Sequence, residues 1–145
     1  AAGMVLAAGA EAEAVFSALK TVRPVRGRME LAATRANGAS VYVDYAHTPD
    51  ALENMLKTLS VFLKNDQKLI TIVGCGGDRD KEKRPIMAKI AQAYSHQFIL
   101  TSDNPRTEHP AAILKDMEQG LDASSSHKGI TIEDRLQAIK TASKH

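Results

Sequence analysis

The spacing of apolar residues along the chain predicts five helices. Apolar side chains recur at helical intervals over residues 11–22, where Pro24 ends the pattern, and over residues 48–63 behind the Thr48-Pro49 start signal. Pro85 and Pro110 each favour the start of a further helix, and residues 133–140 form the last. The side chains expected to face inward from these three helices are Ile86, Met87, Ile90 and Ala93; Ile113, Leu114, Met117 and Leu121; and Leu136 and Ile139.

Short runs rich in β-branched residues separate the helices. Residues 29–35 and 40–45 predict a hairpin across Asn37-Gly38, a strong turn signal, and residues 68–73, 96–101 and 130–132 predict strands between helices. Alternating strands and helices indicate right-handed βαβ units. The predicted fold class is therefore α/β, with a three-layer, Rossmann-like and mostly parallel sheet. Because the chain stops just past a helix, we expect it to be cut at both ends and to lack its last strand.

Composition adds a boundary and several exclusions. The segment RPVRGR holds two helix breakers and three arginines, so we divide the chain into residues 1–23 and 24–145. With 43% hydrophobic and 25% charged residues, a disordered chain is excluded, and a net charge of +2 without a basic cluster argues against a nucleic-acid partner. The apolar opening is too short for a membrane helix and lacks the basic flank of a signal peptide.

Three loops that follow strands hold most of the unusual chemistry. They span residues 44–50, 74–85 and 102–110. In an open parallel sheet, ligands bind outside the carboxyl ends of the strands, where such loops meet helix N-termini. We therefore expect the functional site at this edge of the sheet.

The loop GCGGDRDKEKRP, residues 74–85, allows two interpretations. Its glycines permit a close backbone approach and charges of both signs follow them, as in a ligand-binding loop. It matches neither the Walker A pattern nor the dinucleotide fingerprint, so a solvated charged turn is equally compatible with it. Cys75 has no base assigned to it, which favours a small packing residue over a nucleophile.

The loop that contains Asp103-Asn104-Pro105-Arg106 is more specific. It presents a guanidinium beside an amide and a carboxylate, a set suited to a zwitterion such as an amino acid. The alternative is an Asx turn that leads into the helix at Pro110, with Arg106 solvated. The residues alone favour the turn.

Two further candidates lie earlier in the chain. Asp44 and His47 follow a strand, where they suit a ribose hydroxyl, a base or a phosphate, although turn capping is the commoner use of such a pair. Arg28 suits a phosphate or an exposed linker equally well. The other four histidines have no ligand-like spacing, and we predict that all four are surface residues: His96, His109, His127 and His145.

The motifs GRMEL, VDYAHTPDALENML, GCGGDRDKEKRP and TSDNPRTEHP, in this order, resemble the C-terminal domain of the Mur ligases, over roughly residues 24–140. Within that family the resemblance is to the MurE type. It implies an ATP-dependent amide ligase of peptidoglycan synthesis, which adds meso-diaminopimelate to UDP-MurNAc-L-Ala-D-Glu through an acyl phosphate. This domain would bind the amino acid and close over ATP.

The resemblance also implies roles for individual residues. Arg79, Asp103, Asn104 and Arg106 would bind meso-diaminopimelate, whose second carboxylate distinguishes it from lysine and suits a guanidinium. On the nucleotide side, Arg28, Asp44, His47 and Asp78 match positions that face ATP. No catalytic residue and no metal ligand are assigned in this chain, because the family's P-loop, Mg²⁺ ligands and carbamylated lysine belong to its central domain.

The resemblance sets the expected surroundings of the domain as well. Residues 1–23 would be the tail of the central ATPase domain, and the N-terminal and central domains would be its partners. We expect a cytoplasmic monomer without nucleic-acid or membrane partners, inactive without those domains. Two alternatives stay open, namely a non-catalytic amino-acid or nucleotide-binding module and a ligase similar to folylpolyglutamate synthase. A NAD-dependent oxidoreductase is disfavoured because its glycine spacing is missing.

Overall fold

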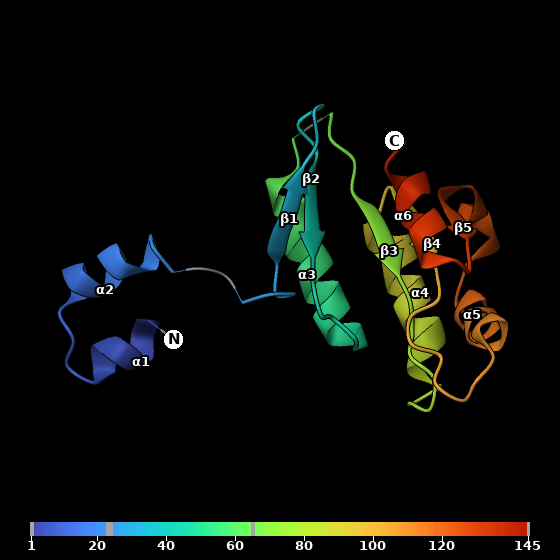
Figure 1. Cartoon of the computed structure of the whole chain (residues 1–145), viewed down its shortest axis with the longest axis horizontal. Helices are drawn as coiled ribbons and strands as arrows, with labels where there is room; N and C mark the ends of the chain where they lie inside the picture. The colour runs from blue at the N-terminus through green and yellow to red at the C-terminus, as the bar shows by residue number, and fades with distance from the viewer. Residues whose placement is uncertain (1, 23–24, 65, 145) are drawn as a thin grey trace. The chain divides into compact units, whose positions relative to one another are not determined.

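A computed structural model of the chain describes residues 2–22, 25–64 and 66–144, apart from the side chains of residues 124–126 (Figure 1). The chain divides into two compact units, Ala1–Tyr45 and Ala46–His145. The predicted division between residues 23 and 24 falls outside the described residues and stays a prediction.

The first unit contains two short helices and a hairpin. Helix α1 spans Ala2–Ala7 and α2 spans Ala12–Leu19, so the predicted helix over residues 11–22 is confirmed but is shorter at both ends. Strands β1 (Glu30–Thr34) and β2 (Ser40–Val43) pair antiparallel, as the turn signal predicted. In that turn Gly38 takes a φ of 84°, a conformation that glycine adopts without strain.

The second unit is built around a parallel sheet. Its strands β3 (Ile70–Val73), β4 (Gln97–Leu100) and β5 (Gly129–Thr131) lie in the order β3-β4-β5, and both pairs are parallel. The helices are α3 (Pro49–Phe62), α4 (Lys83–Tyr94), α5 (Pro110–Glu118) and α6 (Arg135–Ala142), with a 3-10 helix, η1, at Ala123–Lys128. This arrangement confirms the predicted α/β class and the parallel sheet.

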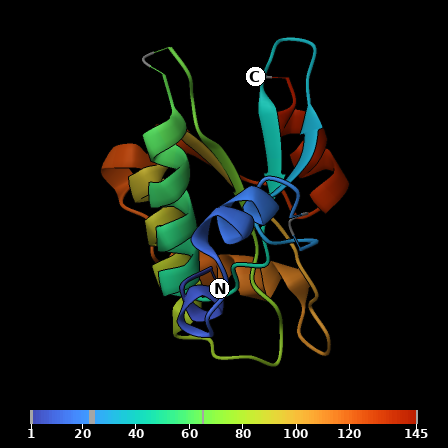
Figure 2. The same cartoon turned by 90° about the vertical axis from the view of Figure 1, so that its left-hand side faces the viewer.

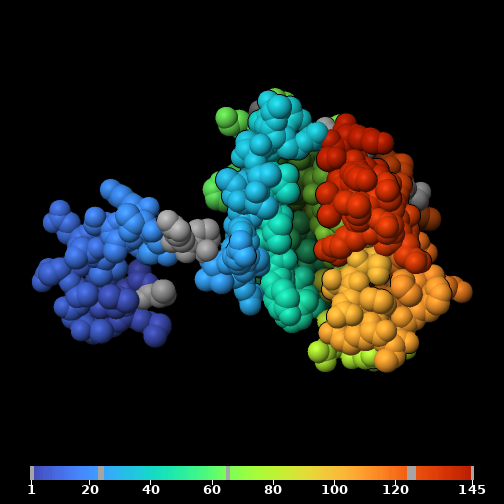
Figure 3. Space-filling model, viewed as in Figure 1, coloured from blue at the N-terminus to red at the C-terminus, as the bar shows by residue number. Residues whose placement is uncertain are grey.

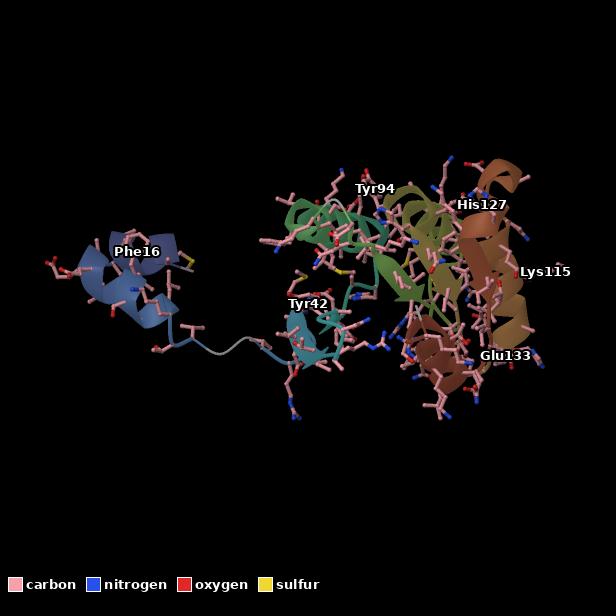
Figure 4. The ribbon with its side chains drawn as sticks, turned by 90° about the horizontal axis from the view of Figure 1, so that it is seen from above. Phe16, Tyr42, Tyr94, Lys115, His127 and Glu133 are labelled. Carbon is pink, nitrogen blue, oxygen red and sulfur yellow. The ribbon has the colours of Figure 1, made fainter. Side chains whose placement is uncertain are left out.

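The second unit has three layers. Helix α4 packs on β3 and β4 with α3 and α5 beside it, and α6 packs on the opposite face of the same strands (Figure 2). Seen from above, Glu133 lies on the side of the sheet that carries α6 (Figure 4). The core between the sheet and α3–α5 is mostly aliphatic, with Phe98 on the central strand. Its largest fully buried apolar members are Leu56, Met87, Phe98, Leu100 and Met117.

The predicted inward face of α4 is confirmed at Met87 and Ile90 and wrong at its other two residues, and that of α6 is wrong. Helix α4 begins at Lys83 rather than at Pro85, which occupies the first turn, where its missing N–H has no partner to lose. Its inward stripe therefore starts at Arg84, and Ile86 and Ala93 are exposed. In α6, which Asp134 caps, the small residue Ala138 is fully buried, and Leu136 and Ile139 are about half exposed.

Candidate functional site

The loops after β3 and β4 pack directly on each other at the carboxyl ends of these strands. The Gly77 N–H donates to the Asn104 carbonyl at 2.9 Å, and Arg106 Nη1 donates to the Gly77 carbonyl at 2.7 Å. Both loops lie at the lower end of the sheet in Figures 1 and 2, and they meet at the lower edge of the space-filling view (Figure 3). The predicted meeting of these two loops is confirmed.

The glycines of the first loop allow this contact. A Cβ built on Gly77 would lie 1.9 Å from the Pro105 carbonyl oxygen, and one on Gly76 would lie 2.8 Å from Arg106 Nη1. Both distances are shorter than any real van der Waals contact. Gly77 is therefore required by the packing of one loop on the other, whatever ligand the loops bind, whereas the flexible end of Arg106 could move away from a Cβ at Gly76.

The loop that carries Asp103 to Arg106 contains the Asx turn that the residues favoured. The Asn104 Oδ1 accepts a hydrogen bond from the Arg106 N–H at 3.2 Å, and Arg106 adopts a left-handed φ of 50°. Arg106 is exposed but is not merely solvated, because its guanidinium is tied to Gly77. The turn interpretation and the ligand-binding interpretation are thus compatible, since the turn fixes the direction in which the guanidinium leaves the loop.

Asp103 has a basic neighbour that the sequence did not indicate. Arg135, the first residue of α6, lies 3.9 Å from the Asp103 carboxylate and donates to the Ser102 carbonyl at 3.1 Å. Both side chains are about half exposed. The connection from β5 to α6 therefore contributes a guanidinium to the same edge of the sheet. Its only signal in the sequence was its place directly after the last strand.

Asp78 connects the two loops through its side chain. Its Oδ1 accepts from the Thr107 hydroxyl at 2.7 Å and its Oδ2 from the Thr107 N–H at 3.2 Å, and these bonds lower the pKa of Asp78. Asp78 has a left-handed φ of 53°. Arg79, the next residue, is exposed. Of the predicted site residues, Asp78, Asn104 and Arg106 are joined by these direct loop-to-loop contacts.

Sequence reasoning missed the buried ion pairs beneath this edge. Arg84 is fully buried and binds both carboxylate oxygens of Glu108, at 2.7 and 3.0 Å, and Asp116 at 2.8 Å. Lys81 lies 3.3 Å from Glu108. The Arg84 guanidinium is the main reason that the pKa of Glu108 is lowered to about 2, and the two acids in turn raise the pKa of Arg84. In the sequence, Arg84 is one of several charged residues that follow the glycines of residues 74–85, and nothing marks it as buried.

The remaining predicted residues have local partners. In the first unit Asp44 Oδ2 accepts from the Met29 N–H at 2.8 Å, and the Arg28 guanidinium lies 5.5 Å from the centre of the Tyr45 ring. In the second unit the His47 carbonyl accepts from Lys83 Nζ at 2.9 Å, which links the segment before α3 to the start of α4.

Cys75 is buried, and its thiol lies 3.7 Å from the Met87 sulfur. Burial raises the pKa of Cys75 to about 11, so the thiol is protonated at neutral pH, as expected for a packing residue.

The histidine prediction holds for three of the four side chains. His96, His109 and His127 are exposed, and His145 lies outside the described residues. His96 and His109 each accept a hydrogen bond from a backbone N–H through Nδ1. Within the described part of the chain, no three His, Cys, Asp or Glu side chains form a group that could hold a metal ion. Among the described helices, none combines the length and hydropathy of a membrane-spanning segment.

The sequence matches a known family and several curated proteins. Residues 27–145 match the family described as "Mur ligase, glutamate ligase domain". UDP-N-acetylmuramoyl-L-alanyl-D-glutamate--2,6-diaminopimelate ligases are 49% identical over 97% of the chain in Bacteroides thetaiotaomicron and 52% identical over 86% in Clostridioides difficile. The chain spans only 29% and 25% of these two relatives.

Solved structures agree with this match. A structure of a UDP-N-acetylmuramoyl-L-alanyl-D-glutamate--2,6-diaminopimelate ligase is similar over 99% of the chain and 28% of its own length, with a TM-score of 0.73 and 42% identity. A folylpolyglutamate synthase from Mycobacterium tuberculosis, complexed with ADP and AMPPCP, covers 94% of the chain and 28% of its own length, with a TM-score of 0.68 and 20% identity. The second likeness shows a shared fold alone.

Proposed function

Because the chain belongs to the Mur ligase family, whose glutamate ligase domain it carries over residues 27–145, we propose that it is the C-terminal domain of a MurE-type ligase. The full-length protein would add meso-diaminopimelate to UDP-MurNAc-L-Ala-D-Glu in an ATP-dependent reaction of peptidoglycan synthesis. The support comes from relatives whose names state this activity. We place the reaction in the cytoplasm, in keeping with the free thiol of Cys75, and expect a monomer.

The observation that carries the proposal is the fixed position of Arg106. Its backbone is held by the Asx turn and its guanidinium by the Gly77 carbonyl, at an exposed edge that also carries Asp103 and Asn104. A guanidinium held in this way can bind the far carboxylate of meso-diaminopimelate in a bidentate manner. Lysine has no carboxylate there, so the same loop that binds one amino acid disfavours the other.

The remaining groups at this edge suit the reacting end of the amino acid. We assign the Asp103 carboxylate to the ammonium and the Asn104 amide to the carboxylate at one stereocentre, with Arg79 as a second guanidinium. The reacting amine attacks as its neutral form, so its ammonium first loses a proton to water. The nitrogen then bonds to the carbonyl carbon of the acyl phosphate, and the C–O bond to the phosphate breaks. The contribution of this domain is to hold the amine in line with the carbonyl carbon of the acyl phosphate, since correct orientation of two reactants lowers the activation barrier.

The nucleotide side of the proposal rests on the first unit and on the loops at residues 44–50 and 74–85. Arg28 is exposed and supplies a positive charge suited to a phosphate, and Asp44, His47 and Asp78 are assigned to ATP. Both Asp78 oxygens already accept from Thr107, yet a carboxylate offers about four lone-pair sites, so ligand contact is compatible with this bond. When bound, ATP would activate the D-glutamate carboxylate of the substrate by transfer of its γ-phosphoryl group, with ADP as the leaving group. We assign the ligands of Mg²⁺ to the central domain.

Phosphate release by the full-length protein tests the proposal. The assay supplies ATP, Mg²⁺ and UDP-MurNAc-L-Ala-D-Glu, and compares meso-diaminopimelate with L-lysine. Release with meso-diaminopimelate alone is expected. Release with lysine would keep the ligase but refute the role of Arg106, and release with neither would favour a binding module.

The substitution Arg106→Ala tests the site itself. Losing a charge-assisted bidentate contact of about 2–3 kcal/mol should lower kcat/KM for meso-diaminopimelate by about 30-fold to 150-fold, while the KM for ATP stays unchanged. Lys89→Ala, which removes an exposed positive charge from α4, is the matched control and should behave as wild type. An unchanged kcat/KM in Arg106→Ala would refute the assignment.

A further inference from the structure

The buried guanidinium of Arg84 lies directly beneath the proposed amino-acid site. It is fully buried at the start of α4, and it binds Glu108 through two nitrogens. Its Nε is also buried and has no hydrogen-bond partner among the described residues. A buried polar hydrogen without a partner is unfavourable, so packing alone does not account for an arginine at this position. The contacts made by its two terminal nitrogens identify what it does.

Those contacts lead into both loops. Glu108 Oε1, which Arg84 binds, also accepts a hydrogen bond from the Asp78 N–H at 2.7 Å. The Asp78 carboxylate in turn holds the hydroxyl and the N–H of Thr107. Thr107 is the residue next to Arg106. Four residues, Arg84, Glu108, Asp78 and Thr107, thus form a continuous chain of contacts from the core to the arginine of the site, and we call them the clasp.

The clasp lies beside two residues whose backbone conformations are unfavourable. Asp78 and Arg106 both have left-handed φ values, 53° and 50°, which residues with a side chain rarely adopt. A carboxylate that accepts the Asp78 N–H and a second that accepts the Thr107 N–H fix the chain beside each of these residues. Without them, either loop can relax to a commoner conformation and carry the Arg106 guanidinium away.

We propose that Arg84 and Glu108 are positioning residues that fix the Arg106 guanidinium for an amino acid with a carboxylate at its far end. Neither residue touches the substrate. Glu108 acts through Asp78 and Thr107, and Arg84 acts by keeping Glu108 ionised and oriented. This inference rests on the proposed function and adds to it the origin of the selectivity for the second carboxylate.

The structure provides a matched control for Glu108. Asp116 also accepts from Arg84, at 2.8 Å, but it lies on α5 and not in either loop. Glu108→Gln and Asp116→Asn therefore each remove one negative charge from the same guanidinium. Only Glu108→Gln weakens the connection to Asp78. A purely structural role of the ion pairs predicts the same effect from both variants.

The experiment measures KM and kcat of the full-length protein for meso-diaminopimelate, L-lysine and ATP, together with Tm. We expect Glu108→Gln to raise the KM for meso-diaminopimelate about tenfold and to lower its preference over lysine. Because Asp78 is also assigned to ATP, the preference between the two amino acids is the deciding measurement, and the KM for ATP is recorded beside it. Asp116→Asn should lower Tm without altering the preference. Equal preferences in the two variants would overturn the proposal.

A surface variant keeps the test valid if Glu108→Gln does not fold. Thr107→Val removes the hydroxyl bond to Asp78 from an exposed position, and Thr107→Ser keeps it. Thr107→Val should raise the KM for meso-diaminopimelate, and Thr107→Ser should restore it. A wild-type KM in Thr107→Val would refute the clasp. Wild-type protein that fails to use meso-diaminopimelate would instead refute the proposed function, and this result is read before any variant is made.

Discussion

Replacing Gly77 by alanine separates the two site loops with one methyl group. The new Cβ would lie 1.9 Å from the Pro105 carbonyl oxygen and 3.3 Å from the Glu108 Cβ. Because the nearest atom belongs to the backbone, no side chain can turn aside to make room. The φ of Gly77 is not in the left-handed region, so alanine brings no backbone strain of its own and the effect is purely steric.

The size of the effect follows from the bonds that the separation breaks. The loops must move apart by about 1 Å, which stretches two hydrogen bonds of 2.9 and 2.7 Å beyond effective length. One is a neutral backbone bond, worth about 1 kcal/mol, and the other carries the charge of Arg106, worth about 1.5–3 kcal/mol. We therefore expect Gly77→Ala to lower the unfolding free energy of the second unit by about 2–4 kcal/mol.

Hydrogen exchange of the β3 and β4 amides is the assay, because it reports the second unit independently of the first. Where exchange requires global unfolding, a loss of 2–4 kcal/mol speeds it by about 30-fold to 1,000-fold. Lys89→Ala, which removes an exposed side chain from α4 of the same unit, is the control. It should change exchange by less than about fivefold, which corresponds to less than 1 kcal/mol. Equal exchange rates in Gly77→Ala and wild type would refute the reasoning.

Three further predictions concern the core, the ion pairs and the thiol. Phe98→Ala removes the most buried aromatic ring of the sheet and should cost about 3–5 kcal/mol in the same exchange assay; a loss below about 1 kcal/mol would contradict its place in the core. Because the pKa of Glu108 is lowered in the folded chain, its ionised carboxylate stabilises the fold fully above about pH 5, and this contribution is lost as the pH falls toward 2. Tm should therefore drop more steeply between pH 5 and pH 2 in wild type than in Glu108→Gln. Parallel plots of Tm against pH would exclude a stabilising ion pair between Glu108 and Arg84. Cys75 should resist iodoacetamide at pH 8 in the folded chain and react in urea, as followed by mass spectrometry, whereas rapid labelling of the folded chain would contradict its burial.

Local signals explain which elements could be predicted from the sequence. Thr48 caps α3 by accepting from the Ala51 N–H, and the Asn37-Gly38 turn joins β1 to β2, because capping and turn chemistry involve only neighbouring residues. Helix α1 was not predicted because its six residues bring no capping signal with them. The inward face of α4 could be predicted only in part for a related reason: the sequence predicts Pro85 as the first helical residue, and it is the third.

The residues of the site, too, could be predicted only where the signal is local in the sequence or follows from the order of the strands. That the loops at residues 74–85 and 102–110 meet could be predicted, since the ends of adjacent parallel strands fix it. The pairing of Arg84 with Glu108 could not, because it joins residues 24 apart and depends on the rotation of α4. The assignments of the substrate-binding and nucleotide-binding residues stay predictions until ligands are tested.

The backbone bond between Gly77 and Asn104 has a consequence for the entropy of ligand binding. Loops that become ordered only around a ligand subtract that loss of freedom from the affinity, at about 0.5–1.5 kcal/mol for each side chain that is immobilised. Here the two loops are already joined to each other, through main-chain and side-chain bonds alike. The loops lose their conformational freedom when the domain folds. An amino acid that binds at this edge therefore contacts hydrogen-bond donors that are already ordered.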